Sequence, residues 1–130
     1  SLEPGQQTDP IVATTTLSAT GNVGLDQDVT GESMCTTYTG STHCPNSSTS
    51  TIPENNQVVA TGTVAYAQGA AISSTTPIEV EINVPKSTAT SSNASANAYW
   101  GIRVPGTITF AGSYTGENTF TAKVGESSAW

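Results

Sequence analysis

The sequence predicts an all-β fold, an antiparallel β-sandwich of about seven strands preceded by an extended N-terminal segment. Apolar residues alternate with polar ones along several short stretches, the pattern of strands that are buried on one face. Good helix formers are scarce, and Gly, Pro, Asn and Ser separate the stretches at turn-like positions. Apolar residues make up 35% of the 130 residues, and this supply fits a thin core between two sheets better than a thick core between helices.

The clearest strand pattern covers residues 78–84. Branched apolar residues and polar residues alternate there without a break, so an extended backbone puts them on opposite faces. Pro77 and Pro85 bracket the segment and set its length. The residues predicted to face the core are Ile78, Val80, Ile82 and Val84.

Alternation of the same kind predicts the remaining strands. The segment that starts at residue 11 is long and extended, and either of its faces could be buried. Pro105 and Gly106 end the strand that contains Trp100. The predicted strands are residues 11–19, 34–38, 58–66, 100–104, 108–110 and 120–124.

Three stretches of small and hydroxyl-bearing residues are predicted as loops, at 40–54, 68–76 and 87–97. We expect residues 1–10 to be an extended leader and residues 11–130 to be a single sandwich domain. A chain of this size is long enough to enclose one core.

The charge balance argues against several classes of partner. Ser and Thr account for 39 residues, whereas Lys and Arg account for three and the net charge is −7. Nucleic acid and anionic membrane surfaces both attract clustered basic residues, which this chain does not have. No run reaches the roughly 18 apolar residues of a spanning helix, so we expect no membrane insertion of this chain. No leader precedes Ser1, which suggests a mature or trimmed chain; removal of an N-terminal helix is the open alternative.

The two cysteines, Cys35 and Cys44, are spaced C-x8-C, which does not suit a zinc site built from paired cysteines. We expect a disulfide that stabilises the fold by roughly 2–3 kcal/mol. Such a bond implies an oxidising compartment, and therefore an extracellular or cell-surface location. Asn46 and Asn93 begin N-glycosylation sequons and are candidate glycosylation sites in exposed loops.

The sequence offers little for catalysis, and we predict a protein that is not an enzyme and uses no cofactor. His43 is the only imidazole, and we expect it to be an exposed loop residue. A Ser-His-acid triad would need it as the base. Glu79 and Glu81 share a strand face about 7 Å apart. Paired carboxylates can hydrolyse glycosides, but a solvated face is the favoured interpretation here.

Residues 26–32 (DQDVTGE) are similar to the front half of a calcium loop, with oxygen ligands at alternate positions and a glycine at the sixth. Thr37 stands at the twelfth position, where such a loop has a glutamate. We therefore expect an acidic turn between strands, with Gly31 at positive φ, and no metal site. The weaker alternative is calcium bound by Asp26, Asp28, Thr30 and Glu32.

The aromatic residues allow two interpretations. Trp100 with Tyr99, or the terminal Trp130, could form a platform on which a sugar stacks. Trp100 has the parity of Ile102 and Val104, so packing in the core is favoured for it. An exposed indole at residue 130 would need a surface on which to dock.

Residues 99–105 (YWGIRVP) followed by 111–122 (AGSYTGENTFTA) are similar to the closing strands of bacterial and archaeal secreted immunoglobulin-like modules. The resemblance covers roughly the last 30 residues. It implies an immunoglobulin-like sandwich in which Tyr114 ties a late strand to an upstream loop. Gly116 stands where the second core cysteine of such domains is expected, so their inter-sheet disulfide is absent. Modules of this type act as stalks, adhesins and filament subunits.

Together these features predict a non-enzymatic extracellular structural protein, a subunit of a surface filament or pilus-like homopolymer. Residues 1–19 could add as a strand to a neighbouring subunit, and the equal alternative is pairing within their own sheet. The residues expected at such an inter-subunit strand are Ile11, Val12, Ala13, Thr15 and Leu17. The alternative function is a cell-surface adhesin or carbohydrate-binding module whose partners are glycans.

Overall fold

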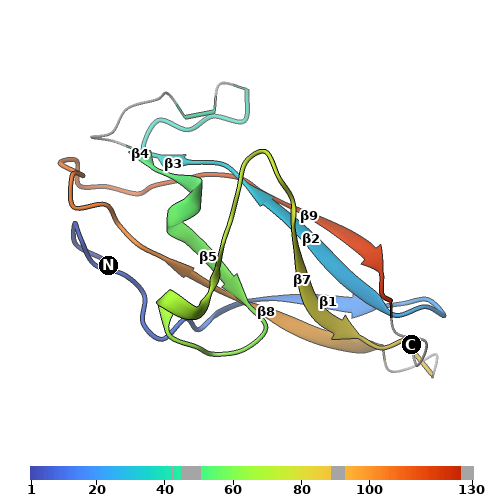
Figure 1. The fold of residues 1–130 in the computed structure, drawn as a ribbon. Helices are drawn as coiled ribbons and strands as arrows, with labels where there is room; N and C mark the ends of the chain where they lie inside the picture. Colours follow the sequence, from blue (N-terminus) through green and yellow to red (C-terminus); the bar gives the residue numbers. More distant parts are fainter. Residues whose placement is uncertain (42, 45–50, 89–92, 127–130) are drawn as a thin grey trace.

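The computed structural model describes residues 1–41, 43–44, 51–88 and 93–126, and it confirms the all-β prediction (Figure 1). Two antiparallel sheets pack against each other as a sandwich. The helical segments in the described ranges are two 3₁₀ turns, η1 (Glu54–Asn56) and η2 (Tyr66–Gln68). Six strands of four or more residues and three two-residue strands make up the described β structure.

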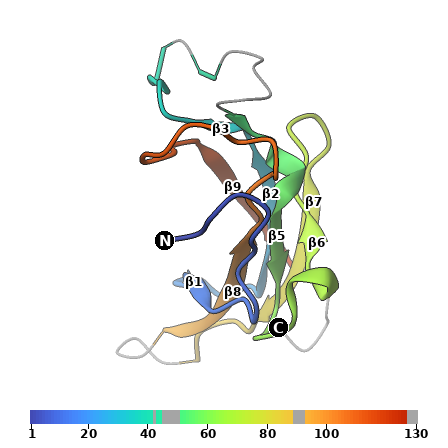
Figure 2. The ribbon, with the colours of Figure 1, turned by 90° about the vertical axis from the view of Figure 1, so that its left-hand side faces the viewer.

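The larger sheet has the strand order β1-β8-β5-β6, and the smaller has the order β7-β2-β9. Strands β3 and β4 form a two-stranded ribbon at one end of the molecule (Figure 1), and Figure 2 shows β3 at that end from a second side. The strands are β1 (Ala13–Ala19), β2 (Leu25–Gly31), β3 (Met34–Cys35), β4 (Thr51–Ile52), β5 (Gln57–Ala60), β6 (Ala70–Ala71), β7 (Ile78–Val84), β8 (Ala94–Ile102) and β9 (Asn118–Val124).

The main core lies between the two sheets, and β7 supplies much of it. This strand has the predicted bounds, with Val80, Ile82 and Val84 buried and the intervening polar residues exposed. A smaller cluster of Ile52, Val104 and Ile108 fills the end of the sandwich near β4. The main core contains Ala19, Val29, Val59, Ile72, Val80, Ile82, Val84 and Ala98.

Strand β8 begins earlier than predicted, inside the segment 87–97 that was expected to be a loop. Ala94, Ala96 and Ala98 continue the inward parity of Trp100 and pack in or against the main core. Alanine is a weak strand former, so the alternation of small residues gave little signal. These alanines matter for packing, because their short side chains on β8 leave room for the branched residues of β7.

Strand β2 was missed altogether and is the central strand of the smaller sheet. Leu25 and Val29 face the core, and Asp26 and Asp28 lie on the opposite side of the strand, where Asp26 is nevertheless fully buried. The acidic turn predicted there is therefore wrong. Gly31 does not have positive φ. A Cβ at Gly31 would lie 2.4 Å from Oδ1 of Asn118 on β9, so close approach of that neighbouring side chain explains the glycine.

Other boundaries also differ from the sequence patterns. The strand predicted over 58–66 ends at Ala60, and the chain then folds back through η2. Val58 and Val59 are both buried because the segment around Gly69 covers the outer face of β5. Residues 108–110 form no strand, and the strand predicted over 34–38 is limited to Met34–Cys35.

The N-terminal segment is fastened to its own chain. The amide of Gly5 donates to the Val104 carbonyl (2.9 Å), and that of Thr8 donates to the Ile102 carbonyl (2.9 Å). Ile11 is fully buried, and β1 then pairs with β8 along its whole length. Residues 1–19 were expected either to add to a neighbouring subunit or to pair within their own sheet, and in this structure their strand β1 pairs within its own sheet.

The docking of Ile11 makes a prediction about Gly101 on β8. A Cβ at this position would lie 2.2 Å from Cγ2 of Ile11. We expect Gly101→Ala to lower the free energy of unfolding by about 1–3 kcal/mol, because Ile11 must move or strain. Urea unfolding measures the change. Gly62→Ala, whose Cβ would meet nothing within 4 Å, is the matched control. Equal effects of the two substitutions would contradict this account.

Candidate functional site

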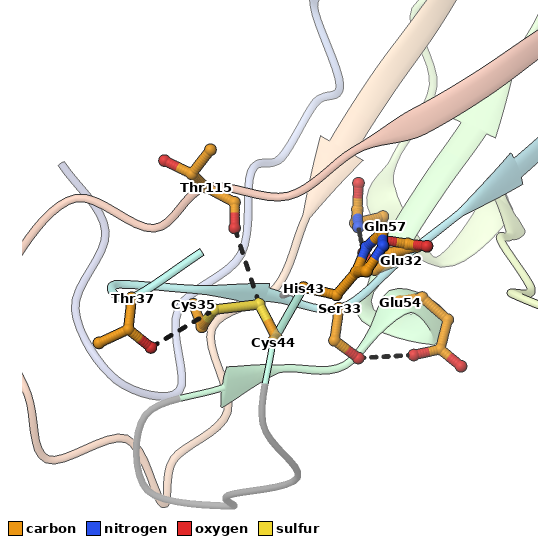
Figure 3. Close-up of a disulfide and its surroundings, with 9 residues drawn as sticks. All are labelled: Glu32, Ser33, Cys35, Thr37, His43, Cys44, Glu54, Gln57 and Thr115. Carbon is orange, nitrogen blue, oxygen red and sulfur yellow. Dashed lines mark hydrogen bonds and ion pairs between the residues drawn. A yellow bond between two sulfur atoms is a disulfide. The ribbon is translucent and has the colours of Figure 1, made fainter. Parts of the chain in front are cut away.

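The disulfide lies at the β3–β4 end of the sandwich. Cys35 on β3 is bonded to Cys44, with their Cα atoms 5.7 Å apart (Figure 3). Backbone hydrogen bonds between Cys35 and Thr115 in both directions hold this end against the segment before β9. The cysteine pair predicted from the spacing is thus joined, and His43, next to Cys44, lies beside Glu32 at the end of β2.

His43 is exposed, as expected, and it has a carboxylate partner. Its Nδ1 lies 2.5 Å from Oε2 of Glu32, just beyond β2, and its ring meets Tyr38 edge-on at 5.8 Å. Figure 3 shows His43 and Glu32 side by side near the disulfide. The backbone of His43 has a φ of 45°, in the left-handed region. The sequence gives no sign of this pair, because His43 reaches Glu32 only when the loop closed by the disulfide returns to the end of β2.

Two serines near His43 donate to another group. The hydroxyls of Ser33 and Ser74 donate to the two carboxylate oxygens of Glu54, at 2.8 and 3.1 Å. These residues line a shallow cavity of about 240 Å³ with His43 and Cys44. The backbone amide of Glu54 and then the Ser33 hydroxyl lower the pKa of this carboxyl, and burial opposes them. A lowered pKa makes this carboxylate a weaker base toward the two serine hydroxyls than an ordinary glutamate.

The lowered pKa of Glu54 predicts how stability depends on pH. Because the folded pKa lies below the ordinary value of 4.5, the contribution of this group is present above that pH and is lost as pH falls through the folded pKa. We expect Glu54→Gln to lose less unfolding free energy than the wild type between neutral pH and about pH 3. Urea titrations at several pH values measure the loss. Glu3→Gln, on the exposed N-terminal segment, is the control. If acidification lowers the free energy of unfolding of Glu54→Gln as much as that of the wild type, Glu54 does not contribute to the pH dependence as proposed.

The calcium loop that was the weaker alternative for residues 26–32 does not form, because residues 25–31 are an extended strand that cannot wrap around an ion. Asp28 is paired with Lys123 on β9 (3.6 Å), Glu32 is held by His43, and Thr30 lies further along the strand. Lys123 also binds Glu79 on β7 at 3.1 Å, so that glutamate belongs to a charged outer sheet face. We call this outer side of β7, β2 and β9 the acidic face; it carries Asp26, Asp28, Glu79, Glu81 and Lys123, with Glu126 at its end.

Asp26 has surroundings that the sequence did not reveal. It is fully buried, and its Oδ1 accepts the backbone N–H of Asn83 at 2.8 Å. Asn83 has a φ of 58° and lies where the pairing of β7 with β2 shifts register. Nearby, desolvation raises the pKa of Glu81, and the charges of Asp26 and Glu126 raise it further.

The inner side of β9 carries an apolar surface of three residues, Phe120, Ala122 and Val124, which we call the β9 strip. In the strand register they stand beside Val29, Gln27 and Leu25, the inward residues of β2. Phe120 is nevertheless 44% exposed and Val124 is 66% exposed. The alternation of Phe120, Ala122 and Val124 with polar residues was predicted from the sequence. The exposure of these three residues was not, because it follows from the position of β9 at the edge of the smaller sheet.

The aromatic residues of β8 do not form one platform. Trp100 is partly buried against the core, its Nε1 donates to Oγ1 of Thr15 (2.8 Å), and its ring meets Phe120 edge-on at 5.3 Å. Tyr99 lies on the other side of the strand. Trp130 and Asn46 lie outside the described residues, and Asn93 is exposed just before β8.

The residues proposed for an inter-subunit strand have unequal surroundings. Ile11 is buried beneath Gly101, whereas Val12 is 63% exposed. Ala13, Thr15 and Leu17 lie on the inner face of β1, opposite Trp100, Ala98 and Ala96 in the register. A donor role for Ile11 would require its release from this position.

An apolar cavity of about 400 Å³ lies at the β3–β4 end and was not predicted. Leu2, Ile108, Phe110 and Tyr114 are among the residues that line it, and Phe110 is 58% exposed. The Tyr114 hydroxyl donates to the Phe110 carbonyl (2.9 Å), four residues earlier in the same segment between β8 and β9. The cavity joins the N-terminal segment to residues about a hundred positions later, so local sequence patterns carry no sign of it.

Comparison with protein-family models, with curated proteins and with solved structures found no match. In the part of the chain that the structure describes, no helix has the length and apolarity needed to cross a membrane.

Proposed function

We propose that the chain is a non-enzymatic extracellular structural protein, a subunit of a surface filament whose copies associate through β-strand contacts. The exposure of the β9 strip is the observation that carries this proposal. Phe120 and Val124 point to the inner side of a sandwich, where such residues are normally covered. A partner that covers the β9 strip would complete the sandwich.

The strand edges beside this surface support the same proposal. Among the described residues, β9 pairs only with β2 and β1 pairs only with β8, so each presents one further edge. Open edges with apolar faces promote pairing with another chain. The edges of β1 and β9 differ from each other, and a contact between unlike surfaces repeats from copy to copy and builds an open polymer when the rotation between copies does not close a ring. A second copy of the chain is therefore the partner that we favour.

The composition fits this role. A disulfide suits an oxidising compartment, and the hydroxyl-rich acidic surface keeps a secreted protein soluble. Among the described residues, His43 pairs with Glu32. The nearby hydroxyls of Ser33 and Ser74 donate to Glu54 and not to His43. These features favour contact over catalysis.

A charge placed on the β9 strip tests the proposal. Val124→Lys should raise the concentration needed for polymer growth by about tenfold or more, because an inward-pointing charge blocks the apolar contact. Sedimentation velocity and negative-stain microscopy measure the growth. Thr121→Lys places the same charge on the outer side of β9 and should leave growth nearly unchanged. A wild-type protein that remains monomeric up to millimolar concentration would contradict the proposal.

The finer form of the proposal, in which residues 1–19 are donated to a neighbour, can be tested separately. Leu17 on β1 and Ala96 on β8 face each other in the register. A disulfide engineered between these two positions would hold β1 in its own sheet. Growth that stops when the disulfide forms and resumes on its reduction would support donation. Growth that continues would support contact between intact edges.

A second candidate function is glycan binding, and the apolar cavity near Phe110 is the observation that favours it. Exposed aromatic rings next to a cavity can stack on sugar faces. Phe110→Ala should then abolish binding to a panel of soluble oligosaccharides, as measured by calorimetry, and leave stability nearly unchanged because the ring is 58% exposed. Trp100→Ala, which removes a ring packed on the core, should instead destabilise the fold. Absence of wild-type binding to any member of the panel would contradict this second function.

A further inference from the structure

Three carboxylates from different parts of the smaller sheet meet at one end of the acidic face. Asp26 comes from β2, Glu81 from β7, and Glu126 follows β9 by two residues. One oxygen atom of each lies within 4.8 Å of those of the other two. Oxygen ligands stand 2.3–2.6 Å from a calcium ion, so two ligands of one ion are at most about 5 Å apart. The spacing therefore allows a single ion to contact all three groups.

The buried member of this cluster gives an independent reason to expect a ligand. Asp26 is fully buried, and its Oδ1 accepts the N–H of Asn83. Its Oδ2 is also buried and has no hydrogen-bond donor in the described structure. An ionised carboxylate can only accept, so a buried oxygen without a donor is costly unless a cation balances it.

The neighbouring basic residue is already engaged. Lys123 binds Glu79 at 3.1 Å and Asp28 at 3.6 Å. Five of the ten Asp and Glu residues of the chain lie on the acidic face, and Lys123 is one of three basic residues in the whole sequence. The charge of Asp26, Glu81 and Glu126 therefore exceeds what this ammonium group can balance.

We propose that Asp26, Glu81 and Glu126 bind one calcium ion. Carboxylate oxygens are the ligands that hard divalent cations prefer, and two of the three groups are exposed glutamates that can adjust to an irregular geometry. Magnesium requires near-octahedral ligands and suits such a site less well. This site shares only Asp26 with the calcium loop considered from the sequence. Its ligands are brought together by the strand order β7-β2-β9, so the ion would tie the three strands together at one end.

Titration of calcium into chelator-treated protein, followed by calorimetry, tests the proposal. We expect one ion per chain with a dissociation constant on the order of 10⁻⁴ M, the range of extracellular modules. Glu126→Gln and Glu81→Gln should each weaken binding by about tenfold or more, because each removes a charged ligand. Glu79→Gln, which alters the same face outside the cluster, is the control and should change affinity far less. Asp26→Asn should weaken calcium binding most. If that variant does not fold, the affinities of the Glu81→Gln and Glu126→Gln variants test the proposal.

A second readout is the thermal unfolding temperature of the intact chain. Calcium should raise it in the wild type and should do so much less in Glu126→Gln, whereas magnesium at equal concentration should have little effect. Equal shifts with both cations, or an equal loss of affinity in Glu79→Gln and Glu126→Gln, would indicate general screening and overturn the proposal. Both measurements use dilute monomer and do not depend on filament assembly, so this inference and the proposed function can fail separately.

Discussion

Packing on both faces of β8 is the constraint on which the rest of the structure depends. On the inner face, Ala94, Ala96 and Ala98 let the branched residues of β7 approach the larger sheet. On the outer face, Gly101 leaves the space that Ile11 fills. The core is therefore concentrated where β7 faces β8. Strand β9 stands at the far edge of the smaller sheet, and its inner side is left with partly exposed Phe120 and Val124. The two sides of β9 consequently differ: the inner side is apolar, and the outer side belongs to the acidic face.

The parts of the fold that could be predicted are those with strong local patterns. Residues 78–84 alternate cleanly between two prolines, and their bounds were correct. Residues 25–31 were misread because outward-facing acids suggested a turn, and only pairing with β7 and β9 makes this segment a strand. The start of β8 was misread because alanines acquire their packing role from β7. In both cases the decisive information lies in a partner strand far away in the sequence.

The same distinction applies to the candidate sites. The spacing of Cys35 and Cys44 was enough to predict their bond, because a short loop brings them together. The pair of His43 with Glu32 depends on the return of that loop to the end of β2, which no local pattern reveals. The cluster of Asp26, Glu81 and Glu126 combines groups from β2, β7 and the segment just after β9, and it follows from sheet order. The sequence pattern grouped Asp26 with Asp28, Thr30 and Glu32, whereas in the fold its carboxylate lies near those of Glu81 and Glu126.

The attachment of the N-terminal segment sets the order in which contacts would break if the chain were pulled from its N-terminal end. Force that enters through residues 1–4 first reaches the hydrogen bonds that join Gly5 and Thr8 to Val104 and Ile102. The buried side chain of Ile11 comes next, and β1 bears load only after both have yielded. The contacts of residues 5–11 therefore lie in series with the pairing of β1 and β8, and a pull on the N-terminal end would break them first.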